Sequence, residues 1–370
     1  MKVAVVRNSS ESQPLSCLGL PCPEKYGRRS IEAVIAGLVM GGHEVALFES
    51  DVTLFDRLRN FFGLDGQAWT GDGMVFNMVY GIQGECRYTH LPAMLEMAGV
   101  PYTGSSPLGH ALALDKIITK TLIHAEGIAT PRWFVAHKAD QDPGDLNFPL
   151  MVKPRHESTS YGLRVVNDRR ELEEAVAVVL NDFGQEALVE EFIDGREVCV
   201  ALLGNDPVEC LPIVELDFGG RDLNAFTLED KMHQRLDEPQ RHCPAELPEA
   251  LAAQIREMAI GTFHACHCRD YSRVDFRIDA AGNPFVLEIN SMASLGENAS
   301  YVMAANAIEH TFSSLVCRIV DVAHQRSLAE RAAVAGAIER ARLLSEQSTV
   351  TQPTEPQPSE SLRLREEFAA

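Results

Sequence analysis

The stretch 272–290 restricts the fold of this chain more than any other segment, because it reads as two strands joined by a tight turn. Charged and apolar residues alternate in its first half, Ala-Gly-Asn-Pro at 281–284 reverses the chain, and a second apolar strand follows. Period two places Asp275 on the face opposite its apolar neighbours, and it places Glu288 and Asn290 on one face of the second strand. Three oxygen-bearing side chains can therefore converge across the hairpin.

Two chemical interpretations of this hairpin face stay open at this point. Two carboxylates and one carboxamide supply hard oxygen ligands, which suit a Mg²⁺ ion that keeps waters and takes further ligands from substrate phosphates. The alternative is a solvated hairpin face with ordinary surface charges, and these residues alone slightly favour it.

Strands and helices alternate over roughly the first hundred residues, which is typical of an open α/β layer. The nearly continuous apolar run Lys2–Arg7 predicts a buried parallel strand. Ser30 is expected to cap a helix that runs through Met40 and ends at Gly41-Gly42. Also expected are strands at His43–Glu49 and Met74–Tyr80 and a helix at Leu91–Ala98.

The middle of the chain has features that suit phosphate binding. A helix is expected to carry Asp115, Lys116 and Lys120. The strand Phe148–Lys153 then leads into the loop Pro154–Gly162, which is rich in Ser, Thr and Gly. Hydroxyls, backbone N–H groups and a lysine together suit a phosphate, although plain turns share this composition.

The second half of the chain adds strands, helices and one long polar segment. Strands are predicted at Leu188–Ile193 and Arg196–Leu203, and helices after Pro248 and from about Tyr301 to Leu344. The segment Phe218–His242 shows little periodicity, and a compact domain usually retains such a segment only as a functional loop or lid.

Composition and charge limit the partners of the chain. The 33 basic and 53 acidic residues give a formal net charge of −20, which argues against nucleic acid or membrane because both reward basic surfaces. No apolar run approaches the roughly 18 to 20 residues that span a bilayer, and Arg7 comes too early for a signal peptide. A cytoplasmic protein is therefore expected. From Ser345 on, the Pro-, Gln-, Glu- and Ser-rich sequence predicts a disordered tail.

Nine cysteines are scattered along the chain, unlike the dense, even-numbered framework of a small secreted domain. His264, Cys266, His267 and Cys268 could suggest zinc, but no second pair lies at zinc-ribbon spacing. Small apolar cysteines packing at the end of a helix are the favoured alternative.

Seven short strings occur in a specific order. They are GIQGE at 81–85, LPAMLEMAGVPYTGSS at 91–106, ALALDK at 111–116, FPLMVKP at 148–154, ALVEEFIDGREV at 187–198, HCPAELP at 242–248, and the hairpin pair RVDF and LEIN at 273–276 and 287–290. In this order they resemble the ATP-grasp superfamily, and more closely its D-alanine–D-alanine ligase branch, over about residues 70–320. The resemblance implies a three-domain α/β fold, α+β in parts, with ATP held between the central and C-terminal domains.

The resemblance also implies where the domains begin and end. The expected segments are an N-terminal α/β domain at 1–104, the central and C-terminal ATP-grasp subdomains at 105–190 and 191–325, a helical extension at 326–344 and the tail at 345–370.

The phosphate contacts that the resemblance implies lie in three places. Lys116 and Lys153 would hold the α- and β-phosphates, and Lys231 would reach the γ-phosphate from the lid. Thr159 and Ser160 stand at the Ser-Ser positions of the central loop.

The adenosine contacts that the resemblance implies lie within the predicted strands Leu188–Ile193 and Arg196–Leu203. Glu190 would accept a hydrogen bond from the adenine amino group, and Glu197 would bind the ribose hydroxyls. Glu191, Phe192 and Ile193 would form the hinge beside the adenine.

The resemblance assigns catalytic and metal-binding roles to the hairpin. Asp275, Glu288 and Asn290 would bind magnesium, or manganese in its place, and Arg273 would stabilise charge on the reacting carboxyl group. A carboxylate would attack the γ-phosphoryl group of ATP, and the resulting acyl phosphate would react with an amine. The products would be an amide or peptide bond, ADP and phosphate.

The chain departs from the family where the amino acids would bind. Arg7-Asn8-Ser9-Ser10 replaces a glycine-rich turn, Glu24 matches the amine-binding glutamate only if the alignment slips by one, and Tyr80 replaces a histidine. After Asn290 the usual proline and glycine are missing, and Ala299 stands at a substrate-binding serine unless Ser300 takes its place. The candidate substrate residues are Glu24, Tyr80, Glu85, Ser294 and Ser300.

These departures predict an ATP-dependent carboxylate–amine ligase with altered amino-acid specificity, because a site built to hydrogen-bond particular groups discriminates strongly. The alternatives are an authentic D-alanine–D-alanine ligase of peptidoglycan synthesis and, in another class, a non-catalytic ATP-binding sensor or scaffold. The expected partners are small carboxylate and amine substrates, and the resemblance suggests a homodimer.

Overall fold

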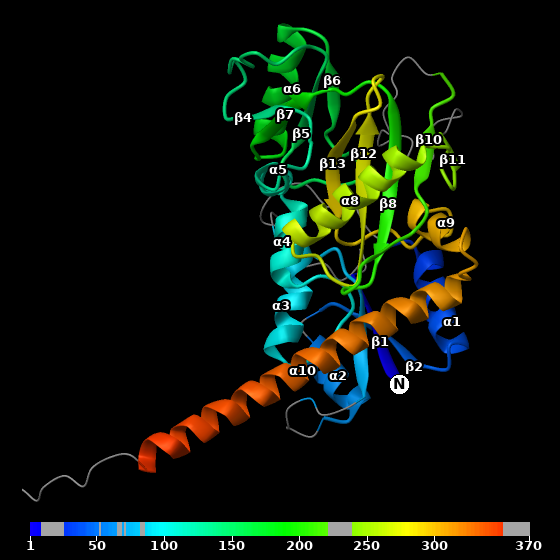
Figure 1. Cartoon of the computed structure of the whole chain (residues 1–370), viewed down its shortest axis with the longest axis vertical. Coiled ribbons are helices and arrows are strands. Elements are labelled where there is room, and N and C mark those ends of the chain that lie inside the picture. The colour runs from blue at the N-terminus through cyan, green and yellow to red at the C-terminus, as the bar shows by residue number, and fades with distance from the viewer. Residues whose placement is uncertain are drawn as a thin grey trace, which may run out of the picture. The chain divides into compact units, whose positions relative to one another are not determined.

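The structure of the chain, a computed structural model, describes residues 1–8, 26–51, 53–64, 69, 72–81, 86–220 and 239–350, without the side chains of 345–350. It divides into two compact units, Met1–His324 and Gln325–Ala370. All of the described sheets belong to the first unit (Figure 1). No helix among the described residues is long and apolar enough to cross a membrane.

The first sheet is parallel, with the strand order β2 (Glu44–Glu49), β1 (Lys2–Arg7) and β3 (Gly73–Met78). Side chains of β1 alternate between two cores, with Val3 in one and Ala4 in the other. A strand that is buried on both faces reads as a continuous apolar run, which is how Lys2–Arg7 reads. The predicted α/β layer is confirmed.

Helices cover both faces of this sheet. α1 (Arg28–Met40) contributes to the core that contains Val3, whereas α2 (Leu54–Phe62) and α3 (His90–Met97) contribute to the other core. The predicted cap at Ser30 is wrong, because Gly27 is extended and α1 already begins at Arg28. The predicted end of the helix at Gly41 is confirmed.

The predicted helix through Asp115 is interrupted at that residue. α4 (Pro107–Leu114) ends there and α5 (Lys116–Ala125) begins. Asp115 has ψ 100°, and its Oδ1 accepts hydrogen bonds of 3.0 Å from the backbone N–H groups of Ile117 and Ile118. An aspartate that caps two free N–H groups starts a new helix, so Asp115 lies between two helices instead of within one.

The second sheet is antiparallel. Its strand order is β4 (Trp133–Ala136), β7 (Ala187–Glu191), β5 (Leu150–Pro154) and β6 (Arg164–Val166). α6 (Arg169–Asp182) is capped by Asp168, whose Oδ1 accepts from the backbone N–H of Glu171 at 2.8 Å. Leu172 and Val176 of α6 pack in the core of this sheet.

The third sheet contains the hairpin predicted at 272–290. Its strand order is β11 (Gln240–His242), β10 (Val214–Asp217), β8 (Arg196–Leu203), β12 (Tyr271–Ile278) and β13 (Pro284–Asn290), with β9 (Glu209–Cys210) beside β8. α8 (Glu249–Ala265) packs against the face that carries Val274 and Phe276. The predicted alternation of the hairpin is confirmed, and its polar face is turned away from α8.

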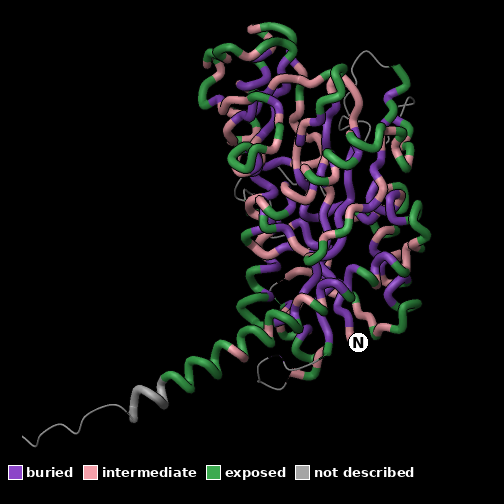
Figure 2. Tube along the Cα trace, in the orientation of Figure 1, coloured by how far each residue is buried: buried purple, intermediate pink, exposed green. Residues whose placement is uncertain are grey.

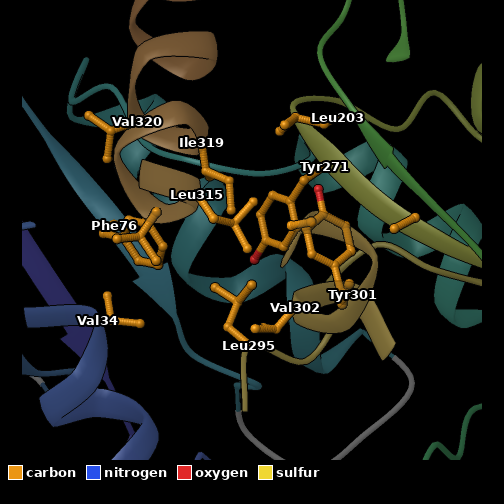
Figure 3. Close-up of a cluster of buried hydrophobic side chains, with 14 of the residues drawn as sticks. Val34, Phe76, Leu203, Tyr271, Leu295, Tyr301, Val302, Leu315, Ile319 and Val320 are labelled. Carbon is orange, nitrogen blue, oxygen red and sulfur yellow. The ribbon is translucent and has the colours of Figure 1, made fainter. Parts of the chain in front are cut away.

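The sheet face that carries the polar residues of the hairpin is apolar at its other end. Towards the N-terminal sheet, Leu203 and Tyr271 pack in a core with Tyr301 from α9 (Ser300–Asn306) and Leu315 from α10 (Phe312–Val350) (Figure 3). Buried residues are concentrated along these central strands (Figure 2). The core therefore holds the strands in place, and the same sheet face presents polar groups further along.

The C-terminal helix extends further than the sequence predicts. α10 continues to Val350, so the prediction of disorder is wrong for 345–350, where the helical hydrogen bonding of the preceding Ala-rich turns propagates. Residues 351–370 lie outside the described part of the chain. The domain boundaries within the first unit stay a prediction.

Candidate active site

A cavity of about 630 Å³ lies over the polar face of the hairpin. Its walls include residues of β5, β7 and β8, the loops 157–163 and 291–300, and the start of α1. Every predicted site residue that the structure describes lines this cavity: Tyr80, Lys116, Lys153, Thr159, Ser160, Glu190, Glu191, Phe192, Ile193, Glu197, Arg273, Asp275, Glu288, Asn290, Ser294 and Ser300. Glu24, Glu85 and Lys231 lie outside the described residues.

The hairpin brings the candidate metal ligands together on its cavity face. Arg273 pairs with Asn290 across the two strands, and Asp275 pairs with Glu288. The register shifts after Asp275, where an extra residue, Leu287, forms a β-bulge. Because the bulge lies outside the four paired positions, their side chains share one face.

Asp275 is the centre of this polar group. Its two oxygens accept hydrogen bonds from Arg273 at 2.6 and 2.7 Å, and Asn290 Nδ2 donates to Oδ2 at 3.0 Å. Burial disfavours the charged guanidinium, but the attraction and hydrogen bonds of Asp275 outweigh it and raise the pKa of Arg273. Arg273 is therefore a permanent cation inside the cavity.

The donor set of the hairpin fits magnesium better than a softer metal. Asp275, Glu288 and Asn290 offer hard oxygen ligands, and a Mg²⁺ ion completes its shell with waters and substrate phosphates. No group of three or more His, Cys, Asp or Glu side chains is placed to hold a metal ion in the described part of the chain. A metal at the hairpin would therefore depend on ligands from a bound nucleotide.

The two candidate phosphate lysines approach the cavity from different elements. Lys116, the first residue of α5, places Nζ 3.3 Å from Glu288 Oε2, and it donates to the backbone carbonyl of Glu157. Lys153 of β5 donates to Glu190 Oε1. Each lysine thus contacts a carboxylate in this structure, and an incoming polyphosphate would compete for both cations.

Glu190 lies at the centre of a buried ion cluster. Lys153 contacts one of its oxygens, and Lys120 Nζ lies 2.8 Å from the other. Lys120 also donates to Thr130 Oγ1 at 2.5 Å, and Thr130 donates to the Val286 carbonyl of β13 at 2.8 Å. Burial would raise the pKa of Glu190, but the two lysines lower it below its ordinary value. Glu190 is therefore a charged acceptor held between two lysines.

The hinge residues 191–193 and Glu197, the candidate ribose carboxylate, come after Glu190 in the chain. The backbone N–H groups of Glu191 and Phe192 donate to the carbonyls of Arg132 and Pro149, both at 3.0 Å. Glu197 Oε2 lies 3.0 Å from a guanidinium nitrogen of Arg277. These contacts fix the backbone of the hinge and the orientation of the carboxylate.

The loop after β5 has a strained backbone. Thr159 and Ser160 have φ of 56° and 58°, a left-handed conformation that is rare for residues other than glycine. Buried Arg87 holds the loop by donating to the His156 carbonyl and, at 2.9 Å, to Ser158 Oγ. Strain of this kind persists where surrounding contacts fix it, and it is often found at functional sites.

The far end of the cavity is built from loops and helix ends. Tyr80 stacks on Tyr26 with ring centroids 4.8 Å apart. A Cβ atom on Gly296 would lie 3.9 Å from Ser30 Oγ, so the start of α1 lies beside the loop that follows the hairpin. Ala299 precedes α9 and provides no side-chain cap.

The predicted packing of cysteines at the end of a helix can be checked. Cys266 and Cys268 are buried in the core beside α8, as predicted, and burial raises the pKa of Cys266 to about 11. Cys199 lines the cavity, but burial raises the pKa of this thiol to about 12. A thiol with such a pKa stays protonated near neutral pH and is a poor nucleophile.

Three further residues contribute to the site although no role is predicted for them from the sequence, namely Arg87, Lys120 and Arg277. Lys120 follows Lys116 by one helical turn, so a second inward-facing lysine could have been inferred from this spacing. Arg277 alternates with apolar residues in the hairpin and so shares a face with Asp275. Arg87 gives no such signal, because its partners lie about seventy residues away in the sequence.

Comparisons with known proteins agree with this geometry. Residues 122–321 match the family model described as D-ala D-ala ligase C-terminus. An uncharacterized protein, y4sG of Sinorhizobium fredii, is 47% identical over 331 residues, which cover 88% of this chain and 98% of that protein. The D-alanine–D-alanine ligase of Bordetella petrii is 33% identical over 329 residues, covering 87% and 97%.

Solved structures show the same fold. The D-alanine–D-alanine ligase of Bacillus anthracis, complexed with ATP, superimposes with a TM-score of 0.68 and 22% identity, covering 89% of this chain and 99% of that one. The predicted ATP-grasp fold is confirmed. The chain belongs to the D-alanine–D-alanine ligase family and is an ATP-dependent ligase that forms C–N bonds.

Proposed function

We propose that this ligase activates a carboxylate as an acyl phosphate and joins it to an amine, and that its amino-acid pair is not D-alanine with D-alanine alone. One observation carries the proposal: all of the described residues to which the resemblance gives an ATP or metal role line one cavity. The groups beside them at its far end differ from the family pattern.

The cations of the cavity suit a reaction in which several negative charges meet. Lys116 and Lys153 would bind nucleotide phosphates, each giving up the carboxylate contact that it has here. Lys231, predicted to reach the γ-phosphate, would complete the set. Preorganised cations of this kind stabilise the charge that spreads over a transferring phosphoryl group.

The hairpin would hold magnesium or manganese through Asp275, Glu288 and Asn290. The bound ion would neutralise phosphate oxygens and help to align the γ-phosphoryl group with its acceptor. Asn290 and Asp275 already lie within hydrogen-bond distance, 3.0 Å between Nδ2 and Oδ2, which supports a shared site.

Arg273 would stabilise the second step. When the amine attacks the acyl phosphate, negative charge develops on the former carboxyl oxygen, and a guanidinium beside it lowers the barrier. Asp275 orients Arg273 through two hydrogen bonds, so the donor is positioned in advance. The loop at Thr159 and Ser160 would help to exclude water from the acyl phosphate.

The far end of the cavity supports a changed substrate. Tyr80, Ser294 and Ser300 line it together with Arg29 and Ser30 from the start of α1. Because buried hydrogen-bonding groups discriminate strongly between substrates, a site with different groups selects different ones. Amino acids are the expected class, since the relatives from Bordetella petrii and Bacillus anthracis are D-alanine–D-alanine ligases.

Trapping of the acyl phosphate tests the proposed chemistry. Single amino acids are incubated with ATP, Mg²⁺ and hydroxylamine, which converts an acyl phosphate into a hydroxamate that mass spectrometry identifies. We expect one hydroxamate that depends on ATP and is lost in Glu288→Gln. ATP turnover that yields no hydroxamate from any carboxylate, although a dipeptide forms, would contradict the acyl-phosphate route.

A further inference from the structure

Arg277 of β12 is a buried arginine that lines the cavity, although the resemblance gives it no role. It pairs directly with Glu197 across β12 and β8, so both side chains stand on the cavity face. The guanidinium lies 3.0 Å from Glu197 Oε2, and Arg277 is only 3% exposed. A charge-assisted hydrogen bond in such a setting fixes the orientation of the carboxylate.

The same guanidinium also contacts the hinge. One of its nitrogens lies 3.4 Å from the Ile193 carbonyl and 3.3 Å from the Gly195 carbonyl. Gly195 has φ of 149°, and a Cβ atom there would lie 2.1 Å from the carbonyl oxygen of Ile278, the residue after Arg277. The turn between β7 and β8 therefore packs tightly on the end of β12, with Arg277 beneath it.

Two aromatic rings also contact the guanidinium of Arg277. Its central carbon lies 5.1 Å from the ring centroid of Phe192 and 5.8 Å from that of Phe218. Aromatic faces attract a guanidinium and restrict its plane. Arg277 thus connects three groups: the hinge aromatic, the hinge carbonyls and the candidate ribose carboxylate.

We propose that Arg277 is a nucleotide-positioning residue, which holds Glu197 for the ribose hydroxyls and the turn at 193–195 for the adenine. This inference rests on the proposed binding of ATP in the cavity. One oxygen of Glu197 contacts Arg277, and a carboxylate has further lone pairs with which it can accept hydrogen bonds from ribose hydroxyls. Arg277 acts through Glu197 and the hinge, so its loss should alter recognition of the ribose in particular.

The test compares the binding of ATP and 2′-deoxyATP, measured by titration calorimetry with Mg²⁺, in wild type, Arg277→Met, Arg277→Lys and Glu197→Gln. Wild type should prefer ATP about tenfold, the ratio that one lost hydrogen bond to a charged group gives. Arg277→Met should bind ATP at least about tenfold more weakly and lose most of this preference. Arg277→Lys, which keeps the charge without the planar fork, should fall between the two.

A matched control is Arg196→Met. Arg196 bonds Glu215 at 2.6 and 2.7 Å across the same sheet but does not line the cavity, so both nucleotides should bind as in wild type. The double variant Arg277→Met with Glu197→Gln should discriminate between ATP and 2′-deoxyATP no less than Glu197→Gln alone, because Arg277 acts on the ribose only through Glu197.

The outcomes distinguish a failure of the role proposed for Arg277 from a failure of the proposed function. Equal weakening of both nucleotides in Arg277→Met, with the wild-type preference intact, would overturn the proposal and leave Arg277 a structural residue. A wild-type protein that binds ATP without any preference over 2′-deoxyATP would overturn it as well. A wild-type protein that binds neither nucleotide would instead refute the proposed function itself.

Discussion

The proposed nucleotide half and the proposed amino-acid half of the cavity are built in different ways. In the nucleotide half, Glu190, Glu197 and Asp275 stand on paired strands, and each contacts at least one cation. In the amino-acid half, the walls are the start of α1 and the loop 291–300. A strand position is fixed by the register of its neighbours, whereas a loop can change without altering the sheet.

This difference suggests how one fold can serve several substrates. Changing a strand residue such as Asp275 would leave a charged partner uncompensated inside the protein, and that is costly. Changing a loop residue at the far end alters only the groups that meet the substrate. We therefore expect variants of the two halves to fail in different ways.

The largest effect should come from Glu288→Gln, which removes one carboxylate of the candidate metal site. We expect kcat to fall about a thousandfold, because charge neutralisation at the transferring phosphoryl group is lost, while ATP still binds. ADP release and calorimetry measure the two quantities. Glu173→Gln, on α6 outside the cavity, is the control. Unchanged turnover in Glu288→Gln would remove Glu288 from the mechanism.

The next effect should come from Lys120→Met, which leaves Glu190 with one cation instead of two. Breaking a buried ion pair costs roughly 3 to 5 kcal/mol, so urea unfolding at pH 7 should show a large loss in the free energy of unfolding. Adding Glu190→Gln should restore much of this loss. If the double variant were as unstable as the single one, Lys120 would not act through Glu190.

The pH dependence of the same cluster has a definite sign. Since the lysines lower the pKa of Glu190 below 4.5, its ordinary value, the carboxylate stabilises the folded protein above that pH. This contribution should disappear as the pH falls through the lowered pKa, and Lys120→Met should move the loss to higher pH. Unfolding measured from pH 3 to 7 tests this, and identical profiles for wild type and variant would contradict it.

Smaller effects are expected in the amino-acid half. Ala299→Ser and Ser300→Ala should change the KM for an amino acid by up to about tenfold, the value of one hydrogen bond to a charged group, and leave the KM for ATP unchanged. Steady-state kinetics with each substrate varied in turn measures the split. An equal change in the KM for the amino acid and the KM for ATP would contradict the proposed division of the cavity into two halves.

The smallest effect should come from Arg132→Met at the outer edge of the hinge. Arg132 bonds Glu191 at 2.5 Å, but its side chain is half exposed, and exposed ion pairs contribute about 0 to 1 kcal/mol. ATP affinity should therefore change by a few-fold at most. A loss as large as that expected for Arg277→Met would show that the outer face of the hinge also positions the nucleotide.

The parts of the site whose geometry depends on local periodicity can be predicted from the sequence. Period two in the hairpin places Arg273, Asp275, Glu288 and Asn290 on one face, and the structure has them there. Strands such as Lys2–Arg7 were equally visible, because burial on both faces leaves a continuous apolar run.

Other features depend on contacts between distant segments, so no local pattern reveals them. Lys120 meets Glu190 from seventy positions earlier in the chain, and Arg87 reaches the loop after β5 across a similar separation. The break at Asp115 and the bulge at Leu287 arise from backbone geometry, which composition specifies only loosely. The roles assigned to Glu24, Glu85 and Lys231 stay predictions.

The most direct test of the central claim is ADP release at saturating ATP over a panel of amino-acid pairs, with each product identified by mass spectrometry. We expect robust ATP-dependent formation of an amide or peptide bond with at least one pair other than D-alanine with D-alanine. Robust turnover with D-alanine alone, and with no other pair, would contradict it.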